Sequence, residues 1–342
     1  MSVHGDAGIE LFSTCPASKD WPKGTYLDAV REVARWCDAS GYDGILVYTD
    51  NSLVDPWLVS QLILEETESL APLVAIQPIY MHPYAVEKMV ASLAYLHDRR
   101  IYLNMVAGGF RNDLLALNDP TEHDVRYERL VEYTTIINGI LGGEGAFSHT
   151  GSWYTVKNVS MTPRLPAELL PGVFVSGSSP AGLAAARAIG ATAVRYPKPH
   201  AEENGHHPSA DSARLGMRIG VVARETDEEA WSVALERFPD DRAGQITHEL
   251  AMKASDSQWH EQLSALGRED ARTGPNPYWL GPFENYKTFC PYLVGSYEVV
   301  GEEICRYVEL GFRTFILDIP PSAEELDHIG VAFDTALAVV SG

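Results

Sequence analysis

The segment with the clearest chemical meaning is Phe174–Gly182, which reads FVSGSSPAG. An apolar run ends there, Gly177 permits a tight turn, and Ser178 and Ser179 stand directly before a proline that can begin a helix. The free N–H groups and positive dipole end at such a helix start can bind phosphate, with serine hydroxyls completing the site. Ser179 could instead be only the N-cap of that helix. Its place directly after a strand favours the phosphate interpretation.

Polar residues end other apolar runs without forming a familiar catalytic pattern. Asn104 lies inside an apolar run, where its amide needs a partner, either a neighbouring backbone group or the edge of a cofactor ring. At the expected strand ends we find no paired carboxylates with an acid–base partner, no GxSxG and no HExxH. His200, His206 and His207 do not have zinc-ligand spacing and predict a solvated loop. Hydrolysis and a metal site are therefore not expected.

These residues must be positioned by a repeating pattern of strands and helices. Eight apolar runs predict strands, and they begin at Gly8, Gly44, Ala71, Arg100, Gly172, Thr192, Met217 and Arg313. Because the runs are continuously apolar, they suit parallel strands that are covered on both faces. Helix starts lie between them, as at Thr226 and Ser322. The pattern predicts an α/β fold, a (β/α)8 TIM barrel with its active site at the C-terminal strand ends. An open doubly wound sheet is the alternative, but no GxGxxG follows any run.

Two long intervals interrupt this rhythm. About 90 residues separate the seventh and eighth runs, where a simple strand–helix unit needs roughly 30. We interpret residues 226–292 as an insertion that forms a lid, and residues 1–342 as a single domain. The interval 142–171 is rich in Gly, Ser and Thr and is expected to pack over the barrel.

Composition restricts the function classes. Lys and Arg number 26 against 47 Asp and Glu, which gives a formal net charge of −21 and argues against binding to nucleic acids or anionic membranes. No apolar stretch approaches the roughly 20 residues of a membrane span, and no signal peptide is visible. The four cysteines show no CxxC spacing, so neither a zinc site nor a disulfide framework is expected. We expect a cytoplasmic protein.

Six segments, in order, resemble the bacterial luciferase-like monooxygenases, particularly the branch of alkanesulfonate monooxygenase. They are GILVYTDNSLVDPW from Gly44, RIYLNMVAGG from Arg100, RYE from Arg126, FVSGSSPAG from Phe174, RIGVVARETDEEAW from Arg218 and YLVGSYEVVGEEICRYVELGFRTFIL from Tyr292. The resemblance implies a (β/α)8 barrel with a lid insertion after strand seven, usually in a homodimer. It also implies the use of O2 and reduced FMN (FMNH2), which a separate flavin reductase supplies.

The same resemblance implies roles for individual residues. Thr49 and Asn104 would contact the flavin ring, and Tyr127 with Ser178 and Ser179 would hold its phosphate. Arg218 matches an arginine of the sulfonate-cleaving branch and is a candidate catalytic residue. Arg224, at the predicted end of the same strand, is the alternative.

Three positions depart from the sulfonate-cleaving branch. Leu53, Gly220 and Pro320 stand where that branch has cysteine, histidine and tyrosine, and Gly220 is expected to open volume beside Arg218. A desolvated sulfonate would lack donors in such a pocket. We therefore expect a mostly neutral organic substrate in secondary metabolism. The substrate is either a free small molecule or an acyl group on a carrier protein, as in assembly-line relatives.

The surroundings of the pocket and the choice of cofactor complete these expectations. A lid segment around Tyr278, Trp279, Phe283 and Tyr286 could exclude water, and Lys198 and Arg195 are candidates for a carrier-docking patch. Two alternatives remain open at this point. One is an oxidoreductase that uses the deazaflavin F420, and the other is a non-catalytic flavin-binding barrel.

Overall fold

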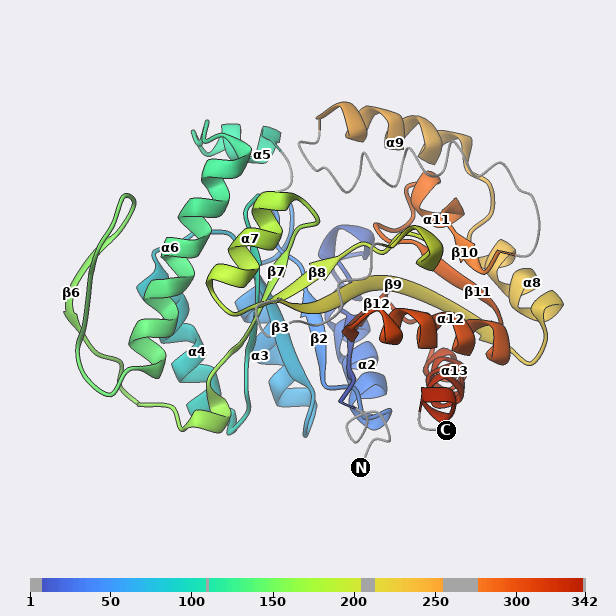
Figure 1. The fold of residues 1–342 in the computed structure, drawn as a ribbon, viewed down its shortest axis with the longest axis horizontal. Coiled ribbons are helices and arrows are strands. Elements are labelled where there is room, and N and C mark those ends of the chain that lie inside the picture. Colours follow the sequence, from blue (N-terminus) through green and yellow to red (C-terminus); the bar gives the residue numbers. More distant parts are fainter. Residues whose placement is uncertain (1–7, 109–110, 204–212, 255–275, 341–342) are drawn as a thin grey trace.

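A closed barrel of eight parallel strands forms the centre of the molecule (Figure 1). The computed structural model describes residues 8–108, 111–203, 213–254 and 276–340. The barrel order is β9, β12, β1, β2, β3, β4, β7, β8, and β8 pairs again with β9. This closure confirms the predicted (β/α)8 barrel. The strands are β1 (Glu10–Thr14), β2 (Gly44–Val47), β3 (Ala71–Ile76), β4 (Tyr102–Val106), β7 (Gly172–Ser176), β8 (Thr192–Arg195), β9 (Arg214–Arg224) and β12 (Phe312–Leu317).

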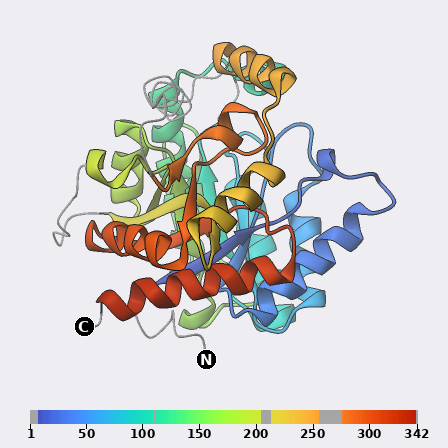
Figure 2. The same cartoon turned by 90° about the vertical axis from the view of Figure 1, so that its right-hand side faces the viewer.

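Helices cover the outside of this barrel (Figures 1 and 2). They are α2 (Tyr26–Ala39), α3 (Pro56–Glu66), α4 (Pro83–His97), α6 (His123–Gly142), α7 (Pro180–Ala188), α8 (Asp227–Arg237), α12 (Tyr297–Glu309) and α13 (Ala323–Val340), whereas the short α5 (Arg111–Ala116) lies at one end of the barrel. Three of the expected N-caps are formed, since Ser179, Thr226 and Ser322 accept hydrogen bonds from the amides three residues later. The buried apolar side chains of these helices pack against those of the strands in two large clusters, which form the core around the barrel.

Strand β9 is longer than the others and leaves the barrel halfway along its length. Its first part pairs with β8 and with β12, where the last pair is Leu317 with Ile219. From Gly220 to Arg224 it pairs instead with β11 (Tyr292–Ser296), which in turn pairs with β10 (Tyr278–Trp279). Sequence analysis did not identify β11, because a five-residue apolar run beside a helix carries no clear period.

The interval that follows α6 forms an antiparallel hairpin of β5 (Phe147–Thr150) and β6 (Thr155–Val159). It lies along the outer side of α6, at the flank of the molecule (Figure 1). The ring of Phe147 fills the space beside Gly139, where a Cβ atom would lie 2.2 Å from the ring. The expectation that this interval packs over the barrel was therefore wrong. The hairpin packs against α6 instead, because Gly139 leaves room for the Phe147 ring on the surface of that helix.

The two ends of the barrel differ. Both termini lie at one end, whereas α5 and α9 (Arg242–Ala254) lie at the other (Figures 1 and 2). The barrel interior is filled by large apolar side chains, namely Phe12, Leu46, Leu73, Phe174, Val194 and Ile316. Residues 255–275 of the predicted lid lie outside the described residues. Within the described ranges, no helix is both long and apolar enough to cross a membrane.

Candidate active site

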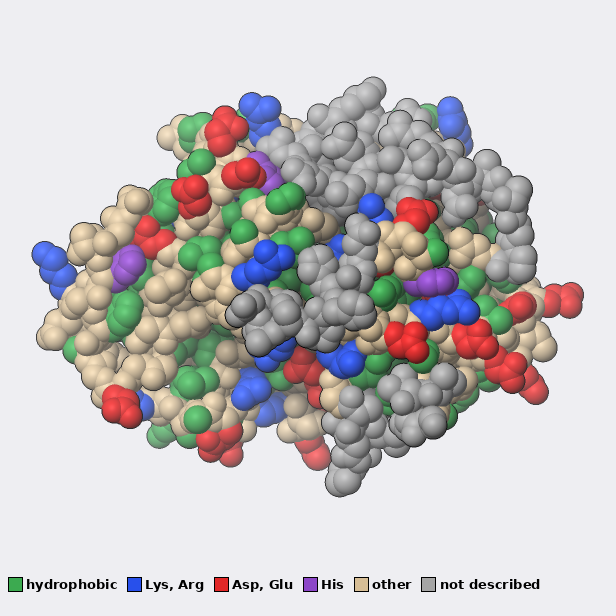
Figure 3. Space-filling model, viewed as in Figure 1, with side chains coloured by type: hydrophobic (Ala, Val, Ile, Leu, Met, Phe, Trp, Pro, Cys, Tyr) green, Lys and Arg blue, Asp and Glu red, His purple; other side chains and the backbone are tan. Residues whose placement is uncertain are grey.

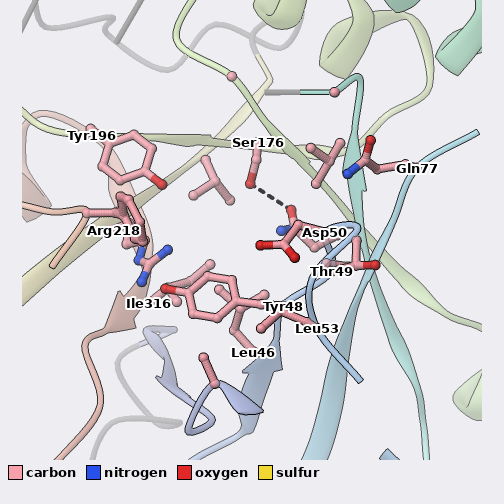
Figure 4. Close-up of a pocket in the computed structure, with 18 of the residues that line it drawn as sticks. Leu46, Tyr48, Thr49, Asp50, Leu53, Gln77, Ser176, Tyr196, Arg218 and Ile316 are labelled. Atoms are coloured by element: carbon pink, nitrogen blue, oxygen red, sulfur yellow. Dashed lines mark hydrogen bonds between the residues drawn. The ribbon is translucent and has the colours of Figure 1, made fainter. Parts of the chain in front are cut away.

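A cavity of about 240 Å³ opens above this interior cluster, at the C-terminal ends of the strands (Figure 4). Its floor includes Leu46, Val194 and Ile316, which belong to the cluster. All the predicted cofactor-binding residues line it, namely Thr49, Asn104, Tyr127, Gly177, Ser178 and Ser179. Arg218 lines it as well. The fold therefore brings together residues that are far apart in the sequence.

One end of the cavity is built by the start of α7 and by Tyr127 from α6. The Ser179 hydroxyl accepts a hydrogen bond from the Gly182 amide at 3.1 Å, so this serine is the N-cap of α7 and a lining residue at once. Gly177 lies against Tyr127, and a Cβ atom there would be 2.3 Å from the phenolic oxygen. Burial raises the pKa of Tyr127, which keeps its hydroxyl protonated as a donor. This end is suited to a phosphate group.

One wall of the cavity presents amide and hydroxyl groups above an apolar floor. The Ser176 hydroxyl donates to Asn104 Oδ1 at 2.8 Å, which leaves the amide nitrogen of Asn104 as a donor for a ligand (Figure 4). The partner of the Asn104 amide is thus the side chain of Ser176. From the sequence alone we considered only a backbone group or a cofactor ring. Gln77, which sequence analysis did not identify, lines the cavity beside Thr49. Such a wall fits a flat ring with polar edges.

Arg218 is buried, with only 4% of its surface exposed, and its guanidinium points toward Tyr48 in the cavity (Figure 4). The guanidinium carbon lies 4.7 Å from the centre of the Tyr48 ring, and Nη2 lies 3.7 Å from Asp318 Oδ1. No hydrogen-bond partner for Nε occurs among the described residues. The last β9 residue that pairs within the barrel is Ile219, directly after Arg218, and the strand leaves the barrel from Gly220 onward. Arg218 therefore lies at the C-terminal rim of the barrel, although it stands in the middle of β9.

Arg224 lies in the extension of β9 and does not line the cavity as the described residues define it. It donates to both carboxylate oxygens of Glu325 on α13, at 3.2 and 2.9 Å, and Arg237 binds the same carboxylate. This buried cluster joins β9, α8 and α13. The geometry favours Arg218 over Arg224 as a residue of the site. Sequence analysis could not separate the two, since the end of the barrel part of β9 is set by pairing.

The three positions that depart from the sulfonate-cleaving branch have different surroundings. Leu53 lines the cavity, and so do Asp318 and Ile319, which precede Pro320. A Cβ atom on Gly220 would lie 2.3 Å from the ring of Tyr292. The expectation of open volume beside Arg218 was therefore wrong, because the Tyr292 ring from β11 occupies that space.

The aromatic segment before β11 is mostly core. Tyr278 donates its hydroxyl to the Pro197 carbonyl at 2.8 Å, Phe283 packs on His248, and Trp279 packs on Trp231. Among the described residues of this segment, the cavity is lined by Lys287, Thr288 and Phe289. The segment reaches the cavity, but through residues other than the aromatic ones expected.

Arg195, the Lys198 backbone and His200 make local contacts with carboxylates. Arg195 forms an ion pair with Glu203 at 3.1 Å, and the Lys198 backbone amide donates to the same carboxylate. His200 binds Glu303 at 2.7 Å, whereas His206 and His207 lie outside the described residues. Over the described ranges, no group of three His, Cys, Asp or Glu residues could hold a metal ion.

Comparison with known proteins identifies relatives of the whole barrel. The family described as luciferase-like monooxygenase matches residues 10–314. The 4-(gamma-L-glutamylamino)butanoyl-[BtrI acyl-carrier protein] monooxygenase BtrO of Niallia circulans is 34% identical over 311 residues, or 90% of each chain.

Solved structures share the fold at low sequence identity. A riboflavin lyase crystallised with modified FMN and riboflavin superposes with a TM-score of 0.73 at 17% identity, over 97% of this chain and 91% of its own. An F420-dependent secondary alcohol dehydrogenase, in complex with an F420–acetone adduct, gives 0.64 at 14% identity, over 96% and 99%. Proteins of this fold therefore bind either FMN or F420.

Proposed function

The chain belongs to the luciferase-like monooxygenase family, and on that basis we propose that it is an FMNH2- and O2-dependent monooxygenase whose substrate is an acyl group on a carrier protein. The observation that carries this proposal is the cavity. The start of α7, which is suited to phosphate, the polar wall with Asn104, and Arg218 all line it. Reduced FMN would supply two electrons and activate O2, with one oxygen atom entering the substrate and the other leaving as water.

The residues present fit FMN. Its phosphate would lie at the start of α7, against the hydroxyls of Ser178, Ser179 and Tyr127. Gly177 supports this assignment, because any side chain there would displace the Tyr127 hydroxyl from the turn. The ring would lie over the apolar floor with its polar edge toward Asn104 and Thr49. Arg218, buried and facing the same space, would orient the reacting groups.

A carrier-bound acyl group is supported by the relative that shares 34% of its residues over 90% of both chains, since that enzyme's name specifies an acyl-carrier-protein substrate. We expect the part of the acyl chain that meets Leu53 and Ile316 to be mostly neutral. On the face shown in Figure 3, acidic and basic side chains are interspersed. A carrier, itself acidic, would need local basic groups. Lys19 at the cavity is better placed than Lys287 or Arg195, since each of these two already pairs with a carboxylate.

We also propose a homodimer that receives reduced FMN from a separate reductase in the cytoplasm. The neighbouring helices α3 and α4 expose large apolar side chains, namely Leu58, Tyr84, Met89, Tyr95 and Leu96. A second copy of the chain would bury them. The four free cysteines agree with a reducing compartment. Light scattering should give twice the chain mass, and Tyr95→Glu should shift it to one chain, whereas Leu235→Glu on α8 should not.

F420 remains the alternative cofactor, because a solved relative of this fold uses it. The experiment that separates the two is titration of the protein with FMN and with F420, each oxidised and reduced. Oxygen consumption is then measured with FMN, a flavin reductase and NADH. The substrates are butanoyl, 4-aminobutanoyl and 4-(gamma-L-glutamylamino)butanoyl groups on an acyl-carrier protein, and the free acids are the control. Binding of F420 alone, or turnover of the free acids alone, would contradict the proposal.

A further inference from the structure

We propose that Asp318 is a positioning residue for Arg218, and that Tyr292 and Thr288 hold Asp318 in the orientation that this requires. Tyr292 and Thr288 were not among the residues considered for the site from sequence, and Asp318 was noted only as the polar residue at the end of the last predicted strand. The proposal deepens the proposed function, since it concerns the same cavity. Its structural part does not depend on which flavin or substrate is used.

Asp318 directly follows β12 and reaches two partners through different oxygens. Its Oδ2 atom accepts hydrogen bonds from the Tyr292 hydroxyl at 2.8 Å and from the Thr288 hydroxyl. Its Oδ1 atom faces Nη2 of Arg218 at 3.7 Å. Two donors on one oxygen fix the rotation of the carboxylate, so the other oxygen is held toward the guanidinium.

The separation of Arg218 and Asp318 suits a residue that must also bind a ligand. The side chains are only 5% and 13% exposed, so the arginine charge is desolvated and needs a nearby anion. The Asp318 carboxylate, 3.7 Å away, supplies that negative charge without forming a close hydrogen bond to the guanidinium. The guanidinium lines the cavity and also interacts with the buried Cys290 thiol, so its terminal N–H groups that face the cavity are the donors left for a ligand.

Tyr292 reaches Asp318 only because position 220 is glycine. The two residues pair across β9 and β11, and a Cβ atom on Gly220 would meet the Tyr292 ring at 2.3 Å. The Tyr48 ring also lies close to the guanidinium, 4.7 Å from its carbon. Arg218 thus contacts an aromatic ring and a carboxylate, and the position of that carboxylate depends on β11, a strand outside the barrel.

The pair differs from the other buried arginine–carboxylate pair on β9. Arg224 and Glu325 form two hydrogen bonds, and neither lines the cavity as described. Arg218, Asp318 and Thr288 all line it. This contrast indicates that the Arg218–Asp318 pair acts in the site, whereas the Arg224–Glu325 pair joins β9 to α13.

The test compares Tyr292→Phe, Thr288→Val and Asp318→Asn with the wild-type protein, using the carrier-bound substrate that is turned over fastest. Tyr292→Phe and Thr288→Val each remove one hydrogen bond to a charged group and should lower kcat about tenfold, with little change in KM. Asp318→Asn removes the negative charge that faces Arg218 and should lower kcat at least as much. Thr288→Ser should retain the wild-type kcat. Tyr133→Phe is the matched control, because that buried hydroxyl donates to the Met81 carbonyl outside the cavity.

A double-mutant cycle decides whether Asp318 acts through Arg218. Asp318→Asn combined with Arg218→Lys should lose no more activity than Arg218→Lys alone. Crystal structures of the cofactor-free Asp318→Asn and Tyr292→Phe proteins should show the Arg218 guanidinium turned from its wild-type position. Additive losses in the cycle, or an unmoved guanidinium in both crystals, would overturn the proposal. A wild-type protein inactive with FMN would refute the proposed function, and the crystals would still decide this one.

Discussion

The backbone of Gly177 lies directly beneath the hydroxyl of Tyr127, at a separation that leaves no room for a side chain. A Cβ atom at position 177 would be 2.3 Å from the phenolic oxygen of Tyr127, which belongs to α6. This contact joins the turn after β7 to α6 and forms one end of the cavity. A glycine at this turn is therefore a requirement of the site and not only of the turn.

Replacing this glycine should damage the phosphate end of the cavity. We expect Gly177→Ala to push the Tyr127 ring away and to weaken FMN binding at least tenfold, since one charge-assisted hydrogen bond contributes about 1.5–3 kcal/mol. Quenching of FMN fluorescence measures the Kd. Gly24→Ala is the control, because nothing lies within 4 Å of a Cβ atom there. Equal Kd values for the two variants would show that the Tyr127 contact is irrelevant to the cofactor.

Removing the Ser179 hydroxyl should weaken FMN binding more than it weakens the fold. The hydroxyl caps α7 and lines the cavity, so Ser179→Ala should lower the melting temperature slightly and raise the Kd for FMN roughly ten- to a hundredfold. Ser296→Ala removes a similar cap from α12, whose serine does not line the described cavity. It should lower the melting temperature alone. A Ser179→Ala protein with wild-type affinity would argue against phosphate at this helix start.

The two arginines of β9 should respond differently to substitution. Arg218→Lys should reduce kcat with little loss of stability, since lysine keeps the charge but not the planar donor set. Arg224→Ala breaks a buried pair and should destabilise the protein by about 3 kcal/mol, the lower end of the usual range, because Arg237 still neutralises Glu325. Urea unfolding and kcat of the folded fraction measure the two effects. Full turnover by Arg218→Lys with none by folded Arg224→Ala would reverse the assignment.

Stability should fall with rising pH because of Glu87 on α4. Its carboxylate is fully buried, neither oxygen has a partner among the described residues, and burial raises the pKa to about 8. The unfolded chain loses this proton near pH 4.5, whereas the folded chain keeps it until about pH 8. The folded state is therefore disfavoured progressively across that window, by up to about 1.4 kcal/mol per pH unit.

Glu87→Gln tests this prediction directly. The glutamine cannot ionise, so the variant should gain stability relative to wild type as the pH rises from 5 to 8. Urea unfolding at several pH values gives the difference in free energy. Parallel pH profiles for the two proteins would mean that Glu87 is ionised, or finds a partner, in the folded state.

Alkanesulfonates should not be substrates. Leu53 contributes an apolar surface to the cavity, and the Tyr292 ring fills the space beside Gly220. A desolvated sulfonate would find Arg218 but few further donors, each of which contributes about 1.5–3 kcal/mol. With FMN, a reductase and C2 to C10 sulfonates, sulfite release should stay far below ~1 per second, a typical enzymatic rate. Release at that rate would show that the departures do not exclude sulfonates.

The sequence by itself determined the repeating architecture and one end of the site. Eight apolar runs between capped helices predicted the closed barrel, because continuous apolar strands must be covered on both faces. The FVSGSSPAG segment placed Gly177, Ser178 and Ser179 at the start of a helix from local residue types alone. Such features depend on neighbours along the chain, and so they can be read from it.

Only the tertiary structure decided where β9 leaves the barrel, and with it the roles of Arg218 and Arg224. That point depends on pairing with β11, which comes from a segment about 70 residues later and has no distinctive period. The same pairing brings Tyr292 against Gly220 and toward Asp318. The space beside Gly220, which the sequence predicts to be open, is therefore filled by the Tyr292 ring. Contacts between distant strands arise from register and packing, which local residue patterns do not encode.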